Sequence, residues 1–321
     1  MNHKATYKEG DQVGTFTAVK ISPIDELKAT LYELEHGPTG AQVMHIDCND
    51  IENLFCISFQ TLPKDSTGTA HILEHTVLCG SKKYPVKDPF FSMTRRSLNT
   101  FMNAMTGADF TCYPAASQVK QDFYNLLEVY LDAVFFPNLK KLSFLQEGHR
   151  LEFQKPKDLD SPLVYKGIVF NEMKGAMSAP EARLWNSLME NLTPNLPYAY
   201  NSGGDPKDIP KLTYQELKDF HKTFYHPSQA LFFFYGNMPL KAHLDFIEKN
   251  ALKSFVKKPP LAPILKQNRF SSPKSYRTLY PLDEKKSDKK RHRAFAGYER
   301  SHGRTTSVGA TVEAKSVRAR R

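Results

Sequence analysis

The sequence predicts an α+β fold in which strands joined by hairpins are mixed with separate amphipathic helices. Residues 29–35 and 41–48 alternate between apolar and polar around Gly37-Pro38-Thr39-Gly40, a pattern typical of a β-hairpin. Apolar residues recur at helical spacing between Phe123 and Val134, which indicates an amphipathic helix. Because the strands form hairpins and do not alternate strictly with helices, the α+β class is favoured.

The remaining elements are predicted in order along the chain. Residues 54–59 are expected to form a buried strand, and the next helix is framed by N-cap candidates at 65–67 and a C-cap candidate at Gly80. A second hairpin is expected within 101–113, with its turn at 107–109. Later segments with clear periodicity are a helix from near Lys166 through Glu172, helices over 214–225 and 240–252, and strands over 231–235 and 275–282.

Composition predicts three parts. Residues 1–256 hold the elements of one N-terminal domain, and the Lys257-Lys258-Pro259-Pro260 stretch marks 257–282 as a linker and the start of a second, incomplete domain. Residues 283–321 carry 12 Lys and Arg against 5 Asp and Glu, a net +7 that leaves only +3 of the overall +10 to the rest. Few large apolar residues occur there, so this segment is expected to be a disordered basic tail.

The composition also disfavours two kinds of partner. There is no apolar run of 18 residues, and the first residues show neither a secretory signal nor a transit peptide, so we expect a cytoplasmic protein with no membrane partner. The four cysteines lack CxxC spacing and are expected to be reduced thiols. Nucleic acid is disfavoured as a partner because the basic charge is confined to a tail that lacks interleaved aromatic residues.

One short motif carries chemistry: His71-Ile72-Leu73-Glu74-His75, inside the helix predicted between residues 65 and 80. Residues three and four positions apart share one face of a helix, so both imidazoles can bind one metal ion with Glu74 beside them. Zinc accepts imidazole nitrogens and, with three protein ligands, keeps a position for a water whose proton a nearby carboxylate can accept. The order HxxEH is the inverted form of HExxH. Taken alone, the motif also suits a helix with two partly exposed histidines and a surface acid.

Five longer stretches resemble the presequence protease branch of the pitrilysin and insulysin (insulinase) zinc metallopeptidases. They are HILEHTVLCGSKKYPVKDPFF from His71, SLNTFMNAMTGADFTCYP from Ser97, DFYNLLEVYLDAVFFP from Asp122, FLQEGHRLEF from Phe144 and GIVFNEMKGAMS from Gly167. The resemblance extends nearly continuously over residues 7–282. It implies a pitrilysin-type metallohydrolase domain, with a mixed, largely antiparallel sheet covered by helices, that acts as a metalloendopeptidase on short unstructured peptides.

The resemblance also implies the residues of the metal site. His71 and His75 match the zinc-binding histidines of this family, and Glu172 matches its distal zinc carboxylate. Glu74 matches the general base. One Zn²⁺ per chain is therefore the expected cofactor.

Substrate-binding residues are implied in the same way. Leu78, Phe90 and Phe91 match positions that line an apolar substrate pocket, although without the resemblance they would be assigned to the core. Asn103 and Ala104 lie in a segment that resembles the edge strand on which peptides are laid by strand addition. A plain hairpin strand is the alternative for these two residues.

Members of this family are longer than this chain and have two homologous halves that enclose a chamber. Their second half contributes an Arg and a Tyr that hold the substrate and stabilise the oxyanion. We therefore expect a truncated form with low or no activity alone. Its expected partners are peptide substrates and the missing C-terminal half, or a partner chain that supplies it. The alternative function is a non-catalytic, zinc-binding fragment or subunit that binds peptides.

Overall fold

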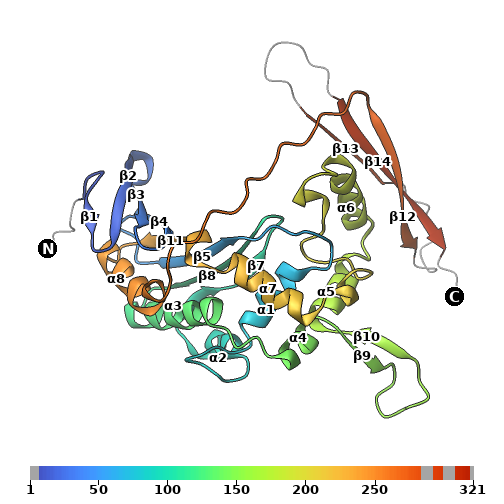
Figure 1. Cartoon of the computed structure of the whole chain (residues 1–321), viewed down its shortest axis with the longest axis horizontal. Coiled ribbons are helices and arrows are strands. Elements are labelled where there is room, and N and C mark those ends of the chain that lie inside the picture. Colours follow the sequence, from blue (N-terminus) through green and yellow to red (C-terminus); the bar gives the residue numbers. More distant parts are fainter. Residues whose placement is uncertain (1–6, 283–291, 299–307, 319–321) are drawn as a thin grey trace. The chain divides into compact units, whose positions relative to one another are not determined.

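Figure 1 shows the computed structural model, which describes residues 7–282, 292–298 and 308–318. The chain divides into two compact units. Unit 1 comprises the described residues of Met1–Thr61, Leu73–Phe144 and Tyr214–Ala262, and unit 2 comprises those of Leu62–Ile72, Leu145–Thr213 and Pro263–Arg321. Each unit is therefore built from three separate segments of sequence, whereas the domain boundaries expected from the sequence are contiguous.

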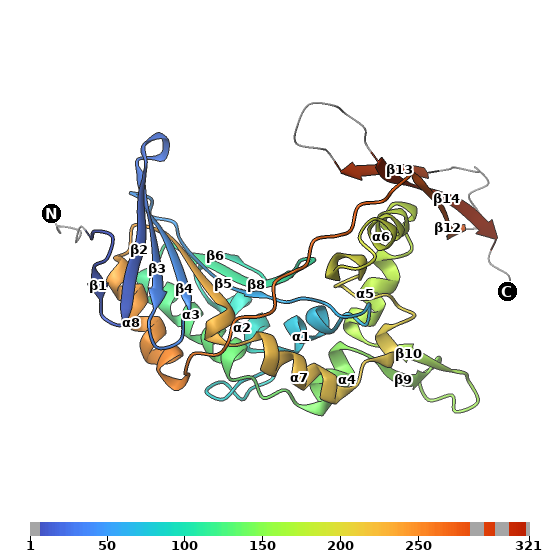
Figure 2. The same ribbon diagram turned by 45° about the horizontal axis from the view of Figure 1, so that its top comes forward.

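A large sheet forms the centre of unit 1 (Figure 2). In spatial order its strands are β1 (Gln12–Val13), β2 (Phe16–Ile24), β3 (Ala29–His36), β4 (Gln42–Asp47), β11 (Ala230–Gly236), β5 (Asn53–Gln60), β8 (Phe110–Ser117) and β6 (Asn99–Met102), and the short β7 (Met105–Thr106) also pairs with β8. Among the described strand pairs of this sheet, β4 and β11 are parallel and the others are antiparallel. The mixed, largely antiparallel sheet expected from the sequence is confirmed.

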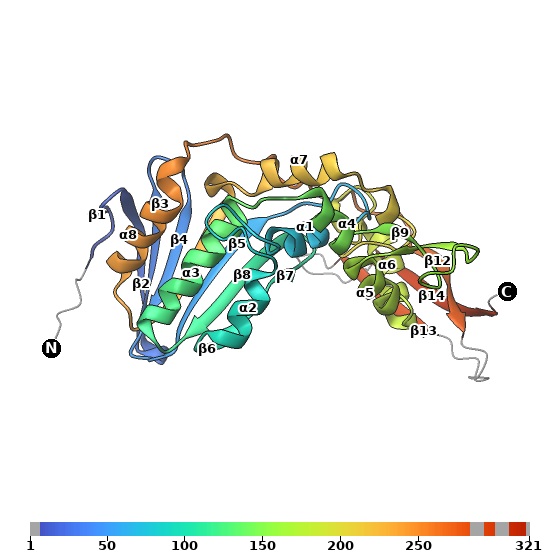
Figure 3. The same cartoon turned by 90° about the horizontal axis from the view of Figure 1, so that it is seen from below.

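The core of unit 1 lies between this sheet and the helices on one of its faces. Phe55, Ile57 and Phe59 of β5 are buried, and the residues between them are more exposed, as the alternation of side chains along a strand requires. The helix α3 (Lys120–Phe135) packs on β5 and β8 and contacts α8 (Leu240–Asn250), and Figure 3 shows both helices in front of the strands. The helix predicted over 123–134 is confirmed and extends further at both ends.

The predicted hairpins are confirmed and one predicted helix is corrected. β3 and β4 pair in register, and at the tip of the second hairpin the Gly107 amide donates to the Phe110 carbonyl. The helix expected from near Lys166 is α5 (Ile168–Ala176), because Lys166 still belongs to strand β10 (Leu163–Lys166). β10 pairs with β9 (Arg150–Phe153), and this pairing holds residue 166 in the strand.

The other described elements include the helices expected around the HILEH motif and over 214–225, together with elements that were not expected from the sequence. They are the helices α1 (Thr69–Val77), α2 (Pro89–Arg96), α4 (Lys141–Glu147), α6 (Pro180–Leu192) and α7 (Tyr214–Phe224), and the 3-10 turns η1 (Asp25–Leu27), η2 (Pro197–Ala199), η3 (Ile209–Lys211), η4 (Pro227–Gln229) and η5 (Leu252–Ser254). Across the described ranges, no helix combines the length and apolar character needed to cross a bilayer.

Unit 2 contains a second sheet, in the order β12 (Lys274–Leu282), β14 (Val308–Arg318) and β13 (His292–Tyr298), which packs against α6. Two of these strands lie in the segment 283–321 that the sequence analysis expects to be disordered, so the expectation is corrected for 292–298 and 308–318. The physical reason is pairing: β14 bonds to β12 on one side and β13 on the other, which supplies backbone partners that composition does not reveal. The rest of that segment lies outside the described residues.

Stability should depend on pH through a buried histidine of unit 1. His226 is 5% exposed, and its Nδ1 accepts a hydrogen bond from the Ser228 amide, a role that requires an unprotonated nitrogen. Burial and the nearby charge of Lys258 lower the pKa of His226 from 6.5 to about 4. Below pH 6.5 the unfolded chain therefore binds a proton that the folded chain excludes, and stability is lost as the pH falls from 6.5 towards 4.

We expect this residue alone to lower the free energy of unfolding by about 2 kcal/mol between pH 8 and pH 5. Urea denaturation of the metal-free chain at the two pH values measures the change. His226→Asn keeps a side-chain acceptor but does not titrate, so it should lose this contribution of about 2 kcal/mol. The contributions of the other histidines whose pKa is lowered by burial, His36, His221 and His243, should remain. An equally steep dependence in His226→Asn would assign the effect to other groups.

Candidate metal centre

The helix α1 carries both histidines and Glu74 of the HILEH motif. Ile72, Leu73 and Val77 are completely buried, so one face of α1 is anchored in the protein. His71 and His75, one turn apart, project from a different face. The burial of Ile72 and Leu73, which lie between the two histidines in the motif, therefore fixes the direction in which His71 and His75 point.

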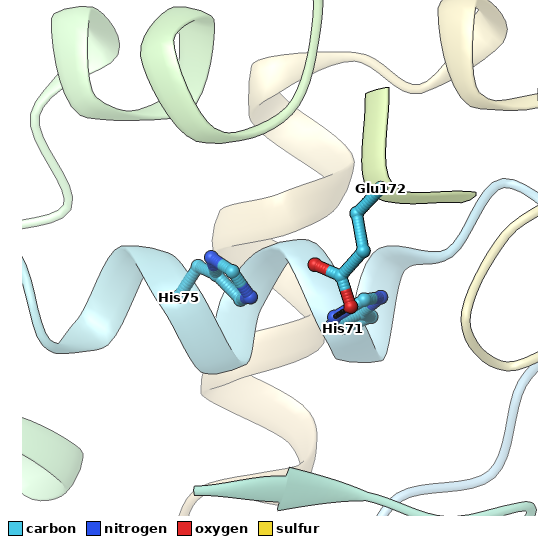
Figure 4. A group of neighbouring side chains, drawn as sticks. All are labelled: His71, His75 and Glu172. Atoms are coloured by element: carbon cyan, nitrogen blue, oxygen red, sulfur yellow. Dashed lines mark ion pairs between the residues drawn. The ribbon is translucent and has the colours of Figure 1, made fainter. Parts of the chain in front are cut away.

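A carboxylate from a second helix reaches the first histidine (Figure 4). Val169 and Phe170 anchor α5 by burial, and Glu172 follows them with a side chain that is 53% exposed. The Oε1 of Glu172 lies 3.7 Å from Nε2 of His71. One ligand atom from each of His71, His75 and Glu172 can be chosen so that all three lie within 4.8 Å of one another. The structure therefore brings together the three metal ligands expected from the sequence.

The three side chains suit a divalent transition metal. Two imidazole nitrogens and one carboxylate oxygen form a donor set that zinc accepts, with bonds of about 2.0–2.1 Å. Two such donors on a tetrahedral ion stand roughly 3.4 Å apart, so the separation of His71 and Glu172 requires only a small adjustment. Three protein ligands leave a fourth position for water, the arrangement that distinguishes catalytic from structural zinc sites.

Glu74 stands outside this group of ligands. It is only 7% exposed, and its Oε2 accepts a hydrogen bond of 2.5 Å from Oγ1 of Thr106 in β7. This bond orients the carboxylate and uses one of its acceptor sites, and the acceptor sites of Oε1 are not involved in it.

Two buried phenols lie within the electrostatic reach of Glu74. The hydroxyl groups of Tyr113 and Tyr225 are 2.7 Å apart. Burial raises the pKa of both, and the negative charge of Glu74 raises it further. Both phenols therefore remain protonated at neutral pH, and Glu74 is the basic group of this part of the site.

The residues expected to bind substrate come from just after α1, from α2 and from the segment between β6 and β7. Leu78 follows α1 and is half-buried, whereas Phe90 and Phe91 belong to α2. Phe91 is 63% exposed, and the ring of Phe90 contacts those of Phe91 and Tyr130. Phe90 is half-buried, so Phe91 is the member of this aromatic pair that is available to an apolar side chain of a ligand.

Asn103 and Ala104 connect β6 to β7, and β6 is the edge strand of the sheet. The Asn103 amide donates to the Pro114 carbonyl, and its own carbonyl accepts from the Tyr130 hydroxyl. The Ala104 amide donates to Oδ1 of Asn103. Asn103 is thus tied into the sheet through its own backbone and side chain.

Two supporting contacts escape sequence reasoning. Thr106 orients Glu74, and the Gly203 carbonyl faces Nδ1 of His71 at 3.1 Å. Both partners are distant in sequence from the residue that they touch, and neither belongs to a motif with ligand spacing. Only the pairing of β7 with β8 and the path of the loop after η2 (Pro197–Ala199) bring them to the site.

Comparison with solved structures identifies the fold. A protease from Helicobacter pylori matches with a TM-score of 0.59 at 20% sequence identity, covering 76% of this chain and 55% of that protein. Pitrilysin matches with a TM-score of 0.55 at 20% identity, covering 77% of this chain and 26% of that chain. The fold is that of the pitrilysin-type proteases.

Sequence comparison gives the family. Residues 62–162 match "Insulinase (Peptidase family M16)" and residues 211–299 match "Peptidase M16 inactive domain". The mitochondrial presequence protease of Xenopus laevis is 50% identical over 282 residues, and that of Mus musculus is 49% identical over 270. Protein HypA of Clostridium perfringens is 41% identical over 291 residues. The chain belongs to the insulinase family, peptidase family M16, and these identities support the presequence protease branch.

The matches cover most of this chain but a small part of its relatives. They include 88%, 84% and 90% of the chain for the frog, mouse and bacterial proteins, and 28%, 26% and 29% of those proteins. The chain therefore spans somewhat over a quarter of the length of these relatives.

Proposed function

We propose that this chain is a zinc-dependent metalloendopeptidase of the inverted HxxEH type that hydrolyses short unstructured peptides. The observation that carries the proposal is that His71 and His75 of α1 lie close to Glu172 of α5. Glu74 lies on α1 between the two histidines. Membership of a peptidase family and the donor chemistry of the three ligands support the proposal.

The residues divide the chemistry between them. A zinc ion bound by His71, His75 and Glu172 would polarise a peptide carbonyl and lower the pKa of a water to about 7. Glu74 accepts the proton of the attacking water at Oε1 and then donates it to the departing amine. Thr106 keeps the Glu74 carboxylate in place during both transfers through its bond to Oε2.

Substrate binding is proposed to use the edge strand β6 and the aromatic side chains of α2. A peptide aligned along β6 near Asn103 and Ala104 would pair through its main chain, which demands an extended conformation and little sequence specificity. Leu78, Phe90 and Phe91 would accept an apolar side chain. This arrangement selects unstructured peptides because a folded substrate has no free strand to offer.

We propose that efficient turnover requires residues beyond this chain. Its relatives are more than three times as long, and a missing C-terminal half or a partner chain would supply the groups that stabilise the oxyanion. The second candidate function follows from the same observation: a zinc-binding fragment or subunit that binds peptides without cleaving them. The cytoplasmic location expected from the sequence stays a prediction, as does the expectation that nucleic acid is not a partner.

Hydrolysis of a matched pair of peptides tests the function. We expect the zinc-loaded chain to cleave an extended fluorogenic peptide and to spare the same sequence closed by a disulfide, because the closed form cannot add to a sheet edge. Mass spectrometry of the products and the zinc content of the chain are measured together. Stoichiometric zinc and peptide binding without cleavage would contradict the enzyme and support the non-catalytic alternative.

A further inference from the structure

The orientation of His71 depends on a backbone carbonyl. Nδ1 of His71 lies 3.1 Å from the carbonyl oxygen of Gly203. A carbonyl oxygen only accepts, so Nδ1 carries the proton and Nε2 carries the lone pair. Nε2 is also the atom that faces Glu172. The Gly203 carbonyl thus selects the tautomer in which the metal-binding nitrogen is free of a proton.

Hydrogen bonds fasten this carbonyl to the segment just before α1. The Gly203 amide donates to Oδ1 of Asn201, and the Asn201 amide donates to Oγ of Ser66. The Asp205 amide donates to the carbonyl of Ser66. The loop 201–205 is therefore tied at both ends to the residues that lead into the helix of His71.

Close backbone contact adds a steric constraint. Gly68 has φ +70°, and a Cβ on it would stand 2.7 Å from the Gly203 oxygen and 2.8 Å from Cα of Gly204. A side chain at residue 68 would thus push away the very carbonyl that holds His71. On another side, a Cβ at Gly203 would meet the end of Met173, the neighbour of Glu172, at 3.0 Å. The loop therefore touches both helices that carry metal ligands.

We propose that the loop 201–205 is a positioning element of the metal centre, with Gly203 orienting His71, and with Asn201 and Gly68 placing Gly203. The inference rests on the proposed function for its metal ion. Partners that orient a metal-binding histidine change metal affinity by about 10- to 100-fold when they are lost. Loss of the Asn201 side chain, or addition of a methyl group at residue 68, should therefore weaken zinc binding by that factor.

Competition with a chelator measures the zinc dissociation constants of Asn201→Ala and Gly68→Ala. Asn201→Asp retains the Oδ1 acceptor for the Gly203 amide but loses the Nδ2 donor to the Gly204 carbonyl, so it should restore part of the affinity. Gly14→Ala is the matched control for residue 68, because Gly14 has φ +65° and no atom within 4 Å of its added Cβ, so it imposes similar backbone strain without a collision. The melting temperature of each metal-free variant shows that it is folded, and Asn201→Ala carries the test if Gly68→Ala fails to fold.

Nitrogen-15 NMR of the His71 ring in the metal-free chain provides a second readout. At pH 8 we expect a protonated Nδ1 in the unsubstituted chain and a mixture of tautomers in Asn201→Ala. Unchanged zinc affinity and an unchanged ring spectrum in both variants would overturn the inference and leave the proposed function intact. If the chain binds no zinc, the proposed function is wrong. The ring spectrum of the metal-free chain would still show whether the loop 201–205 sets the tautomer of His71.

Discussion

Glu74→Gln is expected to lower peptide hydrolysis by about 10² to 10⁴-fold, the usual contribution of a positioned general base. The amide of Gln retains the shape of the side chain and can still accept from Thr106, but it cannot take a proton from water. Because Glu74 is not one of the three metal ligands, zinc occupancy should stay at the level of the unsubstituted chain. Initial rates with a fluorogenic peptide and metal analysis of the same sample measure the two effects.

Glu26→Gln is the matched control, since Glu26 lies exposed in η1 and the substitution removes the same charge. Its rate should equal that of the unsubstituted chain. If Glu74→Gln cleaves peptide as fast as Glu26→Gln, another group accepts the proton and the assigned role of Glu74 is wrong. If Glu74→Gln loses its zinc, the separation of base and ligands in the structure is wrong.

Zinc should stabilise the folded chain, and substitution of a ligand should abolish that effect. A ligand that binds only the folded state adds about 2.7 kcal/mol at a free concentration of one hundred times its dissociation constant. We expect this gain in urea denaturation of the unsubstituted chain and almost none in His75→Ala or Glu172→Gln at the same zinc concentration. Removal of the ion with a chelator should reverse the gain.

Glu181→Gln provides the control for Glu172→Gln, because both residues are exposed glutamates of unit 2. It should keep the full stabilisation by zinc. A similar gain in Glu172→Gln and Glu181→Gln would show that Glu172 is not a ligand, and the candidate site would then be limited to the two histidines of α1.

Much of the fold could be predicted because local patterns agree with the final structure. Alternation marked β3 and β4, a largely apolar run marked β5 as a buried strand, and helical spacing marked α3. Each of these elements contributes buried side chains to the core of unit 1. The tail shows the limit of such patterns. Strands β13 and β14 contain few large apolar residues. β14 pairs with β12, whose residues stand 36 positions earlier in the chain, and β13 pairs with β14. Composition predicts disorder there because it contains no information on backbone partners.

Part of the candidate site could likewise be predicted from local spacing, and part of it could not. His71 and His75 are linked by the geometry of one helix, so spacing alone suggested a shared ion. Glu172 has no local signal, and only the family resemblance selected it before the structure placed it 3.7 Å from His71. Thr106 and Gly203 could not be predicted because their roles arise from chain segments that meet only after folding.

Zinc X-ray absorption spectroscopy of the purified chain tests the central claim most directly. A centre formed by His71, His75 and Glu172 predicts one ion per chain with only nitrogen and oxygen neighbours at about 2.0–2.1 Å, including two imidazoles. The chain also contains four cysteines that form no disulfide, and thiolates bind the same metal. Sulfur neighbours at about 2.3 Å, or a spectrum unchanged in His75→Ala, would contradict the proposed metal centre.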